Sequence, residues 1–150
     1  MAAISIPQEG QRFLGEKPQV IKVAKVSIGV AASNDVVFDA IESLAVFNVP
    51  ANCLVLEVAI YTPTAWTATA ILDVGDGVDP NGWLATAKVA PTVAQTDGVL
   101  KRSTLPTAEA YAAGKLYTAA DTIDVAIGTA IPAVGQSNIF ITYIEDFNVL

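Results

Sequence analysis

Apolar residues in this sequence recur mostly at every second position, which is the period of a β-strand and not of a helix. The first such run covers residues 19–30 and is rich in β-branched side chains, which favour strands. Its apolar face changes parity near Ala24, and this change predicts a bulge or a local twist within one long strand.

A second run, residues 53–61, predicts a strand with Glu57 on one face. Its other face is expected to hold the apolar side chains Leu54, Leu56, Val58 and Ile60. Pro63 is expected to end this strand, because proline cannot donate to a strand ladder. Residues 66–73 then resume the alternation.

Other segments give shorter signals. Residues 35–43 form a brief apolar run, and residues 47–52 contain Pro50 and Asn52 as turn residues. Residues 107–113 predict two helical turns that Gly114 would end. Further strands are predicted at residues 83–89, 115–118, 122–127 and 138–145.

About eight short strands separated by Gly, Pro and Asn turns predict an all-β fold, either an antiparallel β-sandwich, jelly rolls included, or a barrel. We expect one such domain over residues 19–150, preceded by an extended N-terminal arm over residues 1–18. The arm has no sustained period, so its apolar side chains are predicted to bind a partner and not the arm's own domain. These side chains are Ile4, Ile6, Phe13 and Leu14.

Composition limits the classes of partner. Hydrophobic residues make up 53% of the 150 residues and charged residues 15%, and the formal net charge is −7. This charge has the wrong sign for a nucleic-acid partner. The longest uncharged stretch, residues 125–144, contains Gly128, Pro132 and Gly135, so it predicts strand and turn and no membrane span. No secretion signal is recognisable, which predicts synthesis in a cytoplasm.

The chain contains no histidine, which excludes Ser-His-Asp and Cys-His catalysis and histidine-ligated zinc. The single cysteine, Cys53, lies in an apolar run and is expected in the core. Paired carboxylates, such as Asp121 with Asp124, leave a glycosidase open in principle, but acidic residues in turns are far more often solvated. We therefore expect no enzyme activity.

Residues 72–83 form the most distinctive segment. It fails as a dinucleotide-binding fingerprint because Pro80 stands at the third glycine position, and as an EF-hand because the twelfth residue is Leu84. Asp73, Asp76 and Asp79 could still form an irregular calcium site, which is the one cofactor that the sequence leaves open. The alternative is a plain polar turn.

Five aromatic residues raise a second possibility, a platform for a sugar as in carbohydrate-binding modules or adhesins. They are Trp66, Trp83, Tyr61, Tyr111 and Tyr117. Large aromatic side chains are more often core or interface anchors, and that interpretation is favoured here.

Three segments carry a resemblance to a known family: Val-Pro-Ala-Asn at 49–52, Leu-Asp-Val-Gly-Asp-Gly at 72–77, and Lys-Leu-Tyr-Thr-Ala-Ala-Asp-Thr-Ile-Asp-Val at 115–125. Together they resemble the small β-sandwich virion proteins of tailed bacteriophages, which include head decoration or cement proteins. The resemblance implies a protein on the capsid surface that binds the major capsid protein and stabilises its contacts. A tail, neck or fibre component would look similar. No catalytic residues come with this family.

The abundance of apolar and neutral sequence independently predicts a homo-oligomer or a lattice-bound subunit, because a small domain of this kind gains most by sharing surfaces.

Overall fold

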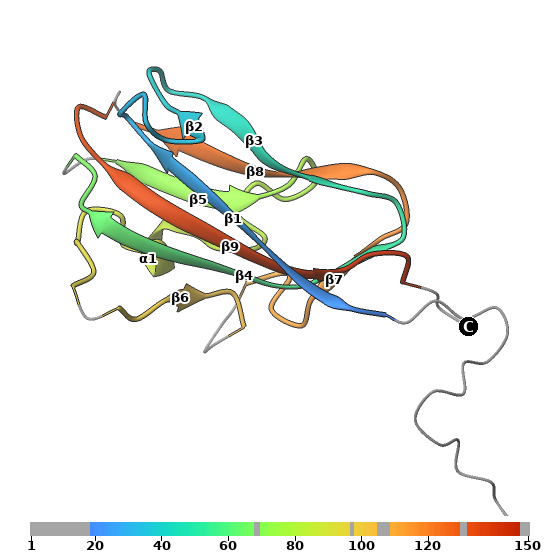
Figure 1. Cartoon of the computed structure of the whole chain (residues 1–150). Helices are drawn as coiled ribbons and strands as arrows, with labels where there is room; N and C mark the ends of the chain where they lie inside the picture. The colour runs from blue at the N-terminus through green and yellow to red at the C-terminus, as the bar shows by residue number, and fades with distance from the viewer. Residues whose placement is uncertain (1–18, 68–69, 97, 105–108, 130–131, 148–150) are drawn as a thin grey trace, which may run out of the picture.

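The computed structural model describes residues 19–67, 70–96, 98–104, 109–129 and 132–147. The described chain folds into two β-sheets that face each other (Figure 1). The larger sheet has six strands in the order β2-β1-β9-β4-β6, with β7 also paired to β4. Its strands are β1 (Ile21–Gly29), β2 (Val36–Val37), β4 (Cys53–Thr64), β6 (Lys101–Arg102), β7 (Lys115–Tyr117) and β9 (Gln136–Ile144).

The smaller sheet has the order β3-β8-β5. Its strands are β3 (Ser43–Val49), β5 (Ile71–Gly75) and β8 (Asp121–Gly128), and one short helix, α1 (Thr86–Val89), packs beside β5. Within the described ranges, all strand pairs are antiparallel except β1 with β2. The predicted antiparallel β-sandwich is confirmed, with one parallel contact at its edge.

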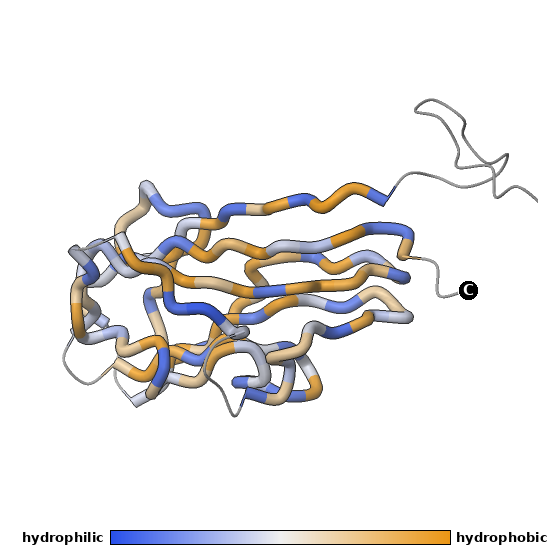
Figure 2. Tube along the Cα trace, turned by 90° about the horizontal axis from the view of Figure 1, so that it is seen from below, coloured by the Kyte–Doolittle hydropathy of each residue, from blue (hydrophilic) through white to orange (hydrophobic). Residues whose placement is uncertain are grey.

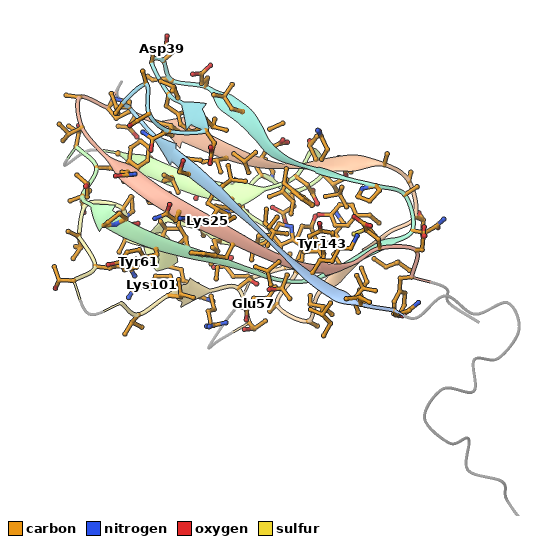
Figure 3. All side chains as sticks on the ribbon, in the orientation of Figure 1. Lys25, Asp39, Glu57, Tyr61, Lys101 and Tyr143 are labelled. Carbon is orange, nitrogen blue, oxygen red and sulfur yellow. The ribbon has the colours of Figure 1, made fainter. Side chains whose placement is uncertain are left out.

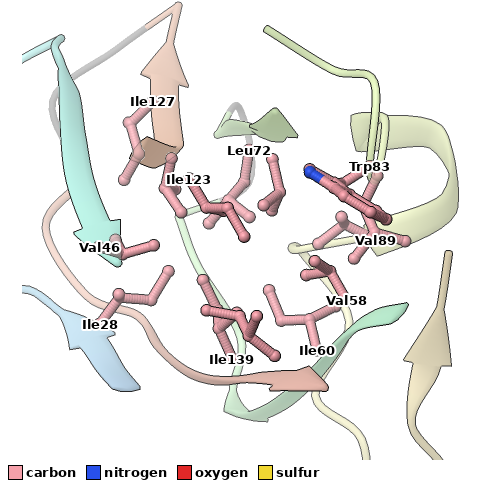
Figure 4. Packing of buried hydrophobic residues seen from close by; sticks show 14 of the residues in the cluster. Ile28, Val46, Val58, Ile60, Leu72, Trp83, Val89, Ile123, Ile127 and Ile139 are labelled. Carbon is pink, nitrogen blue, oxygen red and sulfur yellow. The ribbon is translucent and has the colours of Figure 1, made fainter. Parts of the chain in front are cut away.

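The hydrophobic core fills the space between the two sheets (Figure 4). Each sheet turns one set of alternate side chains inward, and Figure 2 shows apolar and polar residues alternating along the strands. Fully burying a side chain of this size contributes about 1.5–3 kcal/mol, so this layer is the main source of stability. Its labelled members are Ile28, Val58, Ile60 and Ile139 from the larger sheet, Val46, Leu72, Ile123 and Ile127 from the smaller one, and Trp83 and Val89 beside them.

The prediction for the inner face of β4 is wrong in its first half. Val55 and Val58 are both fully buried, while Leu54 and Leu56 are only half-buried. The cause is a β-bulge, because the register of β4 against β9 shifts between Val55 and Glu57. One extra residue there moves the following side chains to the opposite face.

The predicted bulge near Ala24 is also absent from the observed ladder. β1 pairs with β9 without interruption from Ile21 opposite Ile144 to Gly29 opposite Gln136. The parity change instead marks a strand with apolar residues on both faces. Ile21 and Val23 lie on the outer face, where they are 60% and 63% exposed.

Two element boundaries also differ from the predictions. Pro63 does not end β4, which continues to Thr64 across a second register irregularity. Residues 66–67 lie outside strand β5, which begins only at Ile71.

The predicted strand over residues 83–89 is instead the helix α1, entered from a bridge between Leu84 and Val74. Of the predicted helix, residues 107–108 lie outside the described residues, and residues 110–113 form a turn. Strand β3 was not predicted: it joins the end of the apolar run 35–43 to the first residues of the segment 47–52, whose turn residues Pro50 and Asn52 follow the strand.

Candidate functional site

The loop that follows β5 is organised around the buried carboxylate of Asp76, which is only 2% exposed. Its Oδ1 atom accepts hydrogen bonds from the backbone N–H groups of Val78 and Asp79, both at 3.0 Å, and from the hydroxyl of Tyr111 at 3.2 Å. Its Oδ2 atom accepts a hydrogen bond from the Tyr117 hydroxyl at 2.7 Å and forms an ion pair with the Lys115 ammonium. The carboxylate therefore joins its own loop to β7 and to the turn before β7.

Aromatic rings enclose this ion pair. The Lys115 ammonium lies 4.2 Å from the ring centre of Tyr111 and 4.7 Å from that of Tyr117. The indole N–H of Trp83 donates to the Tyr117 hydroxyl at 3.2 Å, and the Trp83 and Tyr111 rings meet edge to face. Cation–π contacts and a shielded environment strengthen such a pair.

The pKa values of this cluster follow from its geometry. Burial alone would raise the pKa of Asp76, but hydrogen bonds from Lys115, Tyr117 and the loop backbone outweigh it and lower this pKa to about 2. Burial also opposes the charge of Lys115, yet its bonds to Asp76 and Tyr111 raise the Lys115 pKa. Burial, followed by the bond to Asp76, raises the pKa of Tyr117. The groups are held in fixed charge states at neutral pH, which suits a structural tie and not a proton-transfer site.

The other two candidate calcium ligands have separate partners. Asp73 Oδ1 accepts hydrogen bonds from the backbone N–H of Thr86 at 2.6 Å and from its hydroxyl at 2.9 Å, so it caps α1 from the neighbouring strand. Asp79 Oδ1 accepts a bond of 3.4 Å from the Asn81 N–H. Across the described ranges, no group of three or more Asp, Glu, His or Cys side chains is arranged to hold a metal. Calcium binding stays a prediction, and a cation would have to displace Lys115 from Asp76.

The aromatic residues proposed as a sugar platform mostly face the interior. Trp66, Trp83 and Tyr117 are buried, and only Tyr61 and Tyr111 are partly accessible. The indole of Trp66 donates to the buried hydroxyl of Ser137 at 2.9 Å. These rings act as core anchors, as the favoured interpretation predicts.

A surface cavity of about 340 Å³ opens beside the start of β9. Val30, Ala31, Asn34, Thr64 and Val134 contribute to its lining, and no charged side chain belongs to its described lining. The described lining therefore places no carboxylate or amine beside the Thr64 hydroxyl that could act as a general base.

The outer face of the larger sheet carries exposed apolar side chains, which the sequence pattern indicated but did not identify as a surface. Ile21 and Val23 are 60% and 63% exposed at the start of β1. Lys25 follows on the same face, and the strand registers place Glu57 and Tyr61 there too, all three of which Figure 3 labels. The parity change near Ala24 was the available signal for this exposed apolar surface.

The predicted partner-binding residues Ile4, Ile6, Phe13 and Leu14 lie outside the described residues. Among the described residues, no helix is long and apolar enough to cross a membrane.

No protein-family model and no curated protein matches this sequence at a significant level. Several solved structures do match it. A chain of the capsid asymmetric unit of cyanophage Pam1 aligns with a TM-score of 0.55 and 20% identity, over 93% of this chain and 96% of that one.

Two further matches come from other phage capsids. A chain of the acid-stable capsid of Helicobacter pylori bacteriophage KHP30 aligns with a TM-score of 0.54 and 13% identity, over 89% of this chain and 95% of that one. A chain of the capsid of Ralstonia phage GP4 gives a TM-score of 0.55 and 13% identity over 86% of each chain. At these identities the likeness defines a shared fold.

Proposed function

We propose that this chain is a structural virion protein that decorates the outer surface of a tailed-phage head and stabilises contacts between major capsid subunits. The observation that carries the proposal is the alignment with a Pam1 capsid chain, which covers both chains almost from end to end. A match of this extent means that the whole domain, and not one motif, is shared with a capsid component.

The surface of the domain supports a role in binding. Large apolar side chains are exposed at the start of β1 and in several loops, including Val78 at 80%. Apolar residues grouped on a surface are typical of protein contacts. A specific interface typically buries about 1,600 Å² in total, which a sandwich of this size can supply from one sheet face.

The polar interior supports a structural role in place of a catalytic one. The buried Asp76 cluster satisfies its charges internally. Its function in the proposal is to hold the loop after β5 against β7, so that the domain presents a rigid surface to the capsid.

The proposed partner is the major capsid protein, and the proposed assembly contains several copies of this chain, with residues 1–18 as a clamp. The test is co-purification with assembled virions, followed by labelling with an antibody under the electron microscope. Labelling over the head supports the proposal. Labelling restricted to the tail, neck or fibres would assign the chain to that part of the virion, and absence from virions would overturn the proposal. A glycan array tests the adhesin alternative.

A further inference from the structure

The open edge of β1 offers a row of backbone groups to another strand. In the described part of the chain, β2 covers this edge only at Ile28 and Gly29. The Ser27 N–H donates to Asp35 Oδ2 at 2.7 Å on the β2 side, and the Gly29 carbonyl accepts from the Phe38 N–H on that side.

Backbone groups alternate in direction along a strand that pairs on one side with β9. Since Ser27 points its N–H away from β9, the N–H and C=O groups of Ile21, Val23 and Lys25 also point toward the open edge. The same three residues carry their side chains on the outer face of the sheet. Edge strands with unpaired groups are templates for strand addition unless something covers them.

We infer that this edge receives residues 3–6 of a second copy of the chain as an added β-strand. This inference rests on the proposed role as an assembled virion subunit. Residues 3–6 read Ala-Ile-Ser-Ile, an uncharged alternating pattern typical of strands. Their lack of charge avoids repulsion by Lys22 and Lys25 of the receiving strand.

The chain length favours a second copy over the same copy. Residues 8–14, which lie closer to β1 and could fold back as a hairpin, contain Gly10, Arg12 and three further polar residues and fit a strand poorly. The alternating segment is separated from Ile21 by residues 7–20, far more than the two to five residues of a usual hairpin loop.

Fully extended, this connection of fourteen residues (7–20) reaches on the order of 45 Å, at about 3.3 Å per residue. The nine residues of β1 span only about 30 Å. The connection is therefore long enough to reach a neighbouring copy, and exchange of such a segment between copies costs little in energy.

Two variants at one position separate backbone pairing from side-chain contact. Val23→Pro removes an edge-facing N–H but no bond to β9, whereas Val23→Thr keeps the N–H and reduces only the apolar side chain. We expect Val23→Pro to weaken self-association of the full chain at least tenfold in analytical ultracentrifugation, and Val23→Thr to weaken it less than threefold. Equal association by wild type and Val23→Pro, with equal melting temperatures, would overturn the inference.

Disulfide trapping provides a second measurement that does not depend on proline. Full-length Ile4→Cys chains are mixed with Val23→Cys chains that carry a mass tag, and the mixture is oxidised both in solution and on virions. A mixed disulfide dimer is expected, since paired strands place Cα atoms about 4.5–5.5 Å apart. Absence of the mixed dimer in both settings refutes strand exchange. If the chains bind virions but form no mixed dimer, the proposed function stands without strand exchange. If the chains do not bind virions, the proposed function itself is refuted.

Discussion

Lys115 forms an ion pair with Asp76 at the point where the loop after β5 meets β7, and Tyr117 donates to the same carboxylate oxygen at 2.7 Å. The Asp76 side chain is fully buried, while the Lys115 side chain keeps 22% of its surface exposed. The lysine thus lies between the cluster and the solvent, and the carboxylate binds backbone N–H groups of its own loop on the inner side.

Removing the charge of Asp76 should destabilise the domain. In Asp76→Asn, Lys115 loses its ion pair, and two hydroxyl donors lose a charged acceptor. We expect the free energy of unfolding to fall by about 2–4 kcal/mol. This is less than for a fully buried pair, because Lys115 is partly solvated. For a chain of this size the melting temperature should fall by roughly 5–10 °C. Asp79→Asn, where only a 3.4 Å contact to Asn81 is affected, serves as the control and should change little. Equal melting temperatures for the two variants would contradict a stabilising role for the ion pair.

The same ion pair predicts how stability depends on pH. The pKa of Asp76 is lowered from its usual 3.8 to about 2 in the folded state, so the unfolded chain binds this proton more readily. The resulting stabilisation, about 2 kcal/mol, is present above pH 3.8 and is lost as the pH falls through 2. Denaturant titrations should therefore show a constant gap between wild type and Asp76→Asn from pH 7 to pH 5, and a narrowing gap below pH 4. A gap that is independent of pH would assign the effect to packing.

Gly82 tests the packing around the cluster without changing a charge. A Cβ atom at this position would lie 2.4 Å from a ring carbon of Tyr111, and the Tyr111 ring also contacts Trp83. Gly82→Ala should displace Tyr111 and destabilise the domain by about 1–3 kcal/mol. Gly77 lies in the same loop, and its Cβ would come no closer than 3.9 Å to another atom, so Gly77→Ala is the matched control. Thermal melts of the two variants should differ by several degrees.

Local pattern was sufficient for the strands whose alternation is regular. Residues 19–30, 122–127 and 138–145 predict β1, β8 and β9 within a few residues, because β-branched residues are frequent in all three, and β8 and β9 each keep one uninterrupted apolar face. The pattern fails where a bulge interrupts it. The register of β3 against β8 shifts between Ala45 and Phe47, which breaks the alternation over Ser43–Val49.

The Asp76 cluster was beyond prediction for a different reason. Asp76 lies in a distinctive segment, but its cation Lys115 is 39 residues away, and no local pattern links the two residues. Their meeting depends on how β7 pairs with β4 and on how the loop after β5 returns to bridge Val74 and Leu84. Such contacts are fixed by the global topology and leave no short-range pattern in the sequence.

Calcium binding by Asp73, Asp76 and Asp79 can be tested against the plain-turn alternative by melting in chelator and in excess calcium. A ligand present at 100 times its dissociation constant would stabilise the fold by about 2.7 kcal/mol. If calcium binds, the melting temperature should rise on its addition, and Asp79→Asn should abolish the response while leaving the Lys115–Asp76 pair in place. Identical melting curves in chelator and calcium would assign the loop to the plain turn.

Deleting residues 1–18 tests whether the arm acts between molecules. Its apolar residues Ile4, Ile6, Phe13 and Leu14 lack a period with which to cover their own domain, and ordering a residue costs about 1–2 kcal/mol of backbone entropy. Only a partner that buries these side chains can offset that cost, so removal of the arm should leave the melting temperature of the isolated domain within about 2 °C of wild type, which corresponds to less than about 1 kcal/mol for a chain of this size.

The same deletion should greatly weaken attachment to virions or to neighbouring copies, measured by co-sedimentation. A variant that changes all four apolar residues to serine keeps the length of the arm and should show the same loss. If the arm acts only as a spacer, this serine variant will bind as well as the full chain. If the deletion lowers the melting temperature strongly, the arm packs on its own domain and the clamp is excluded.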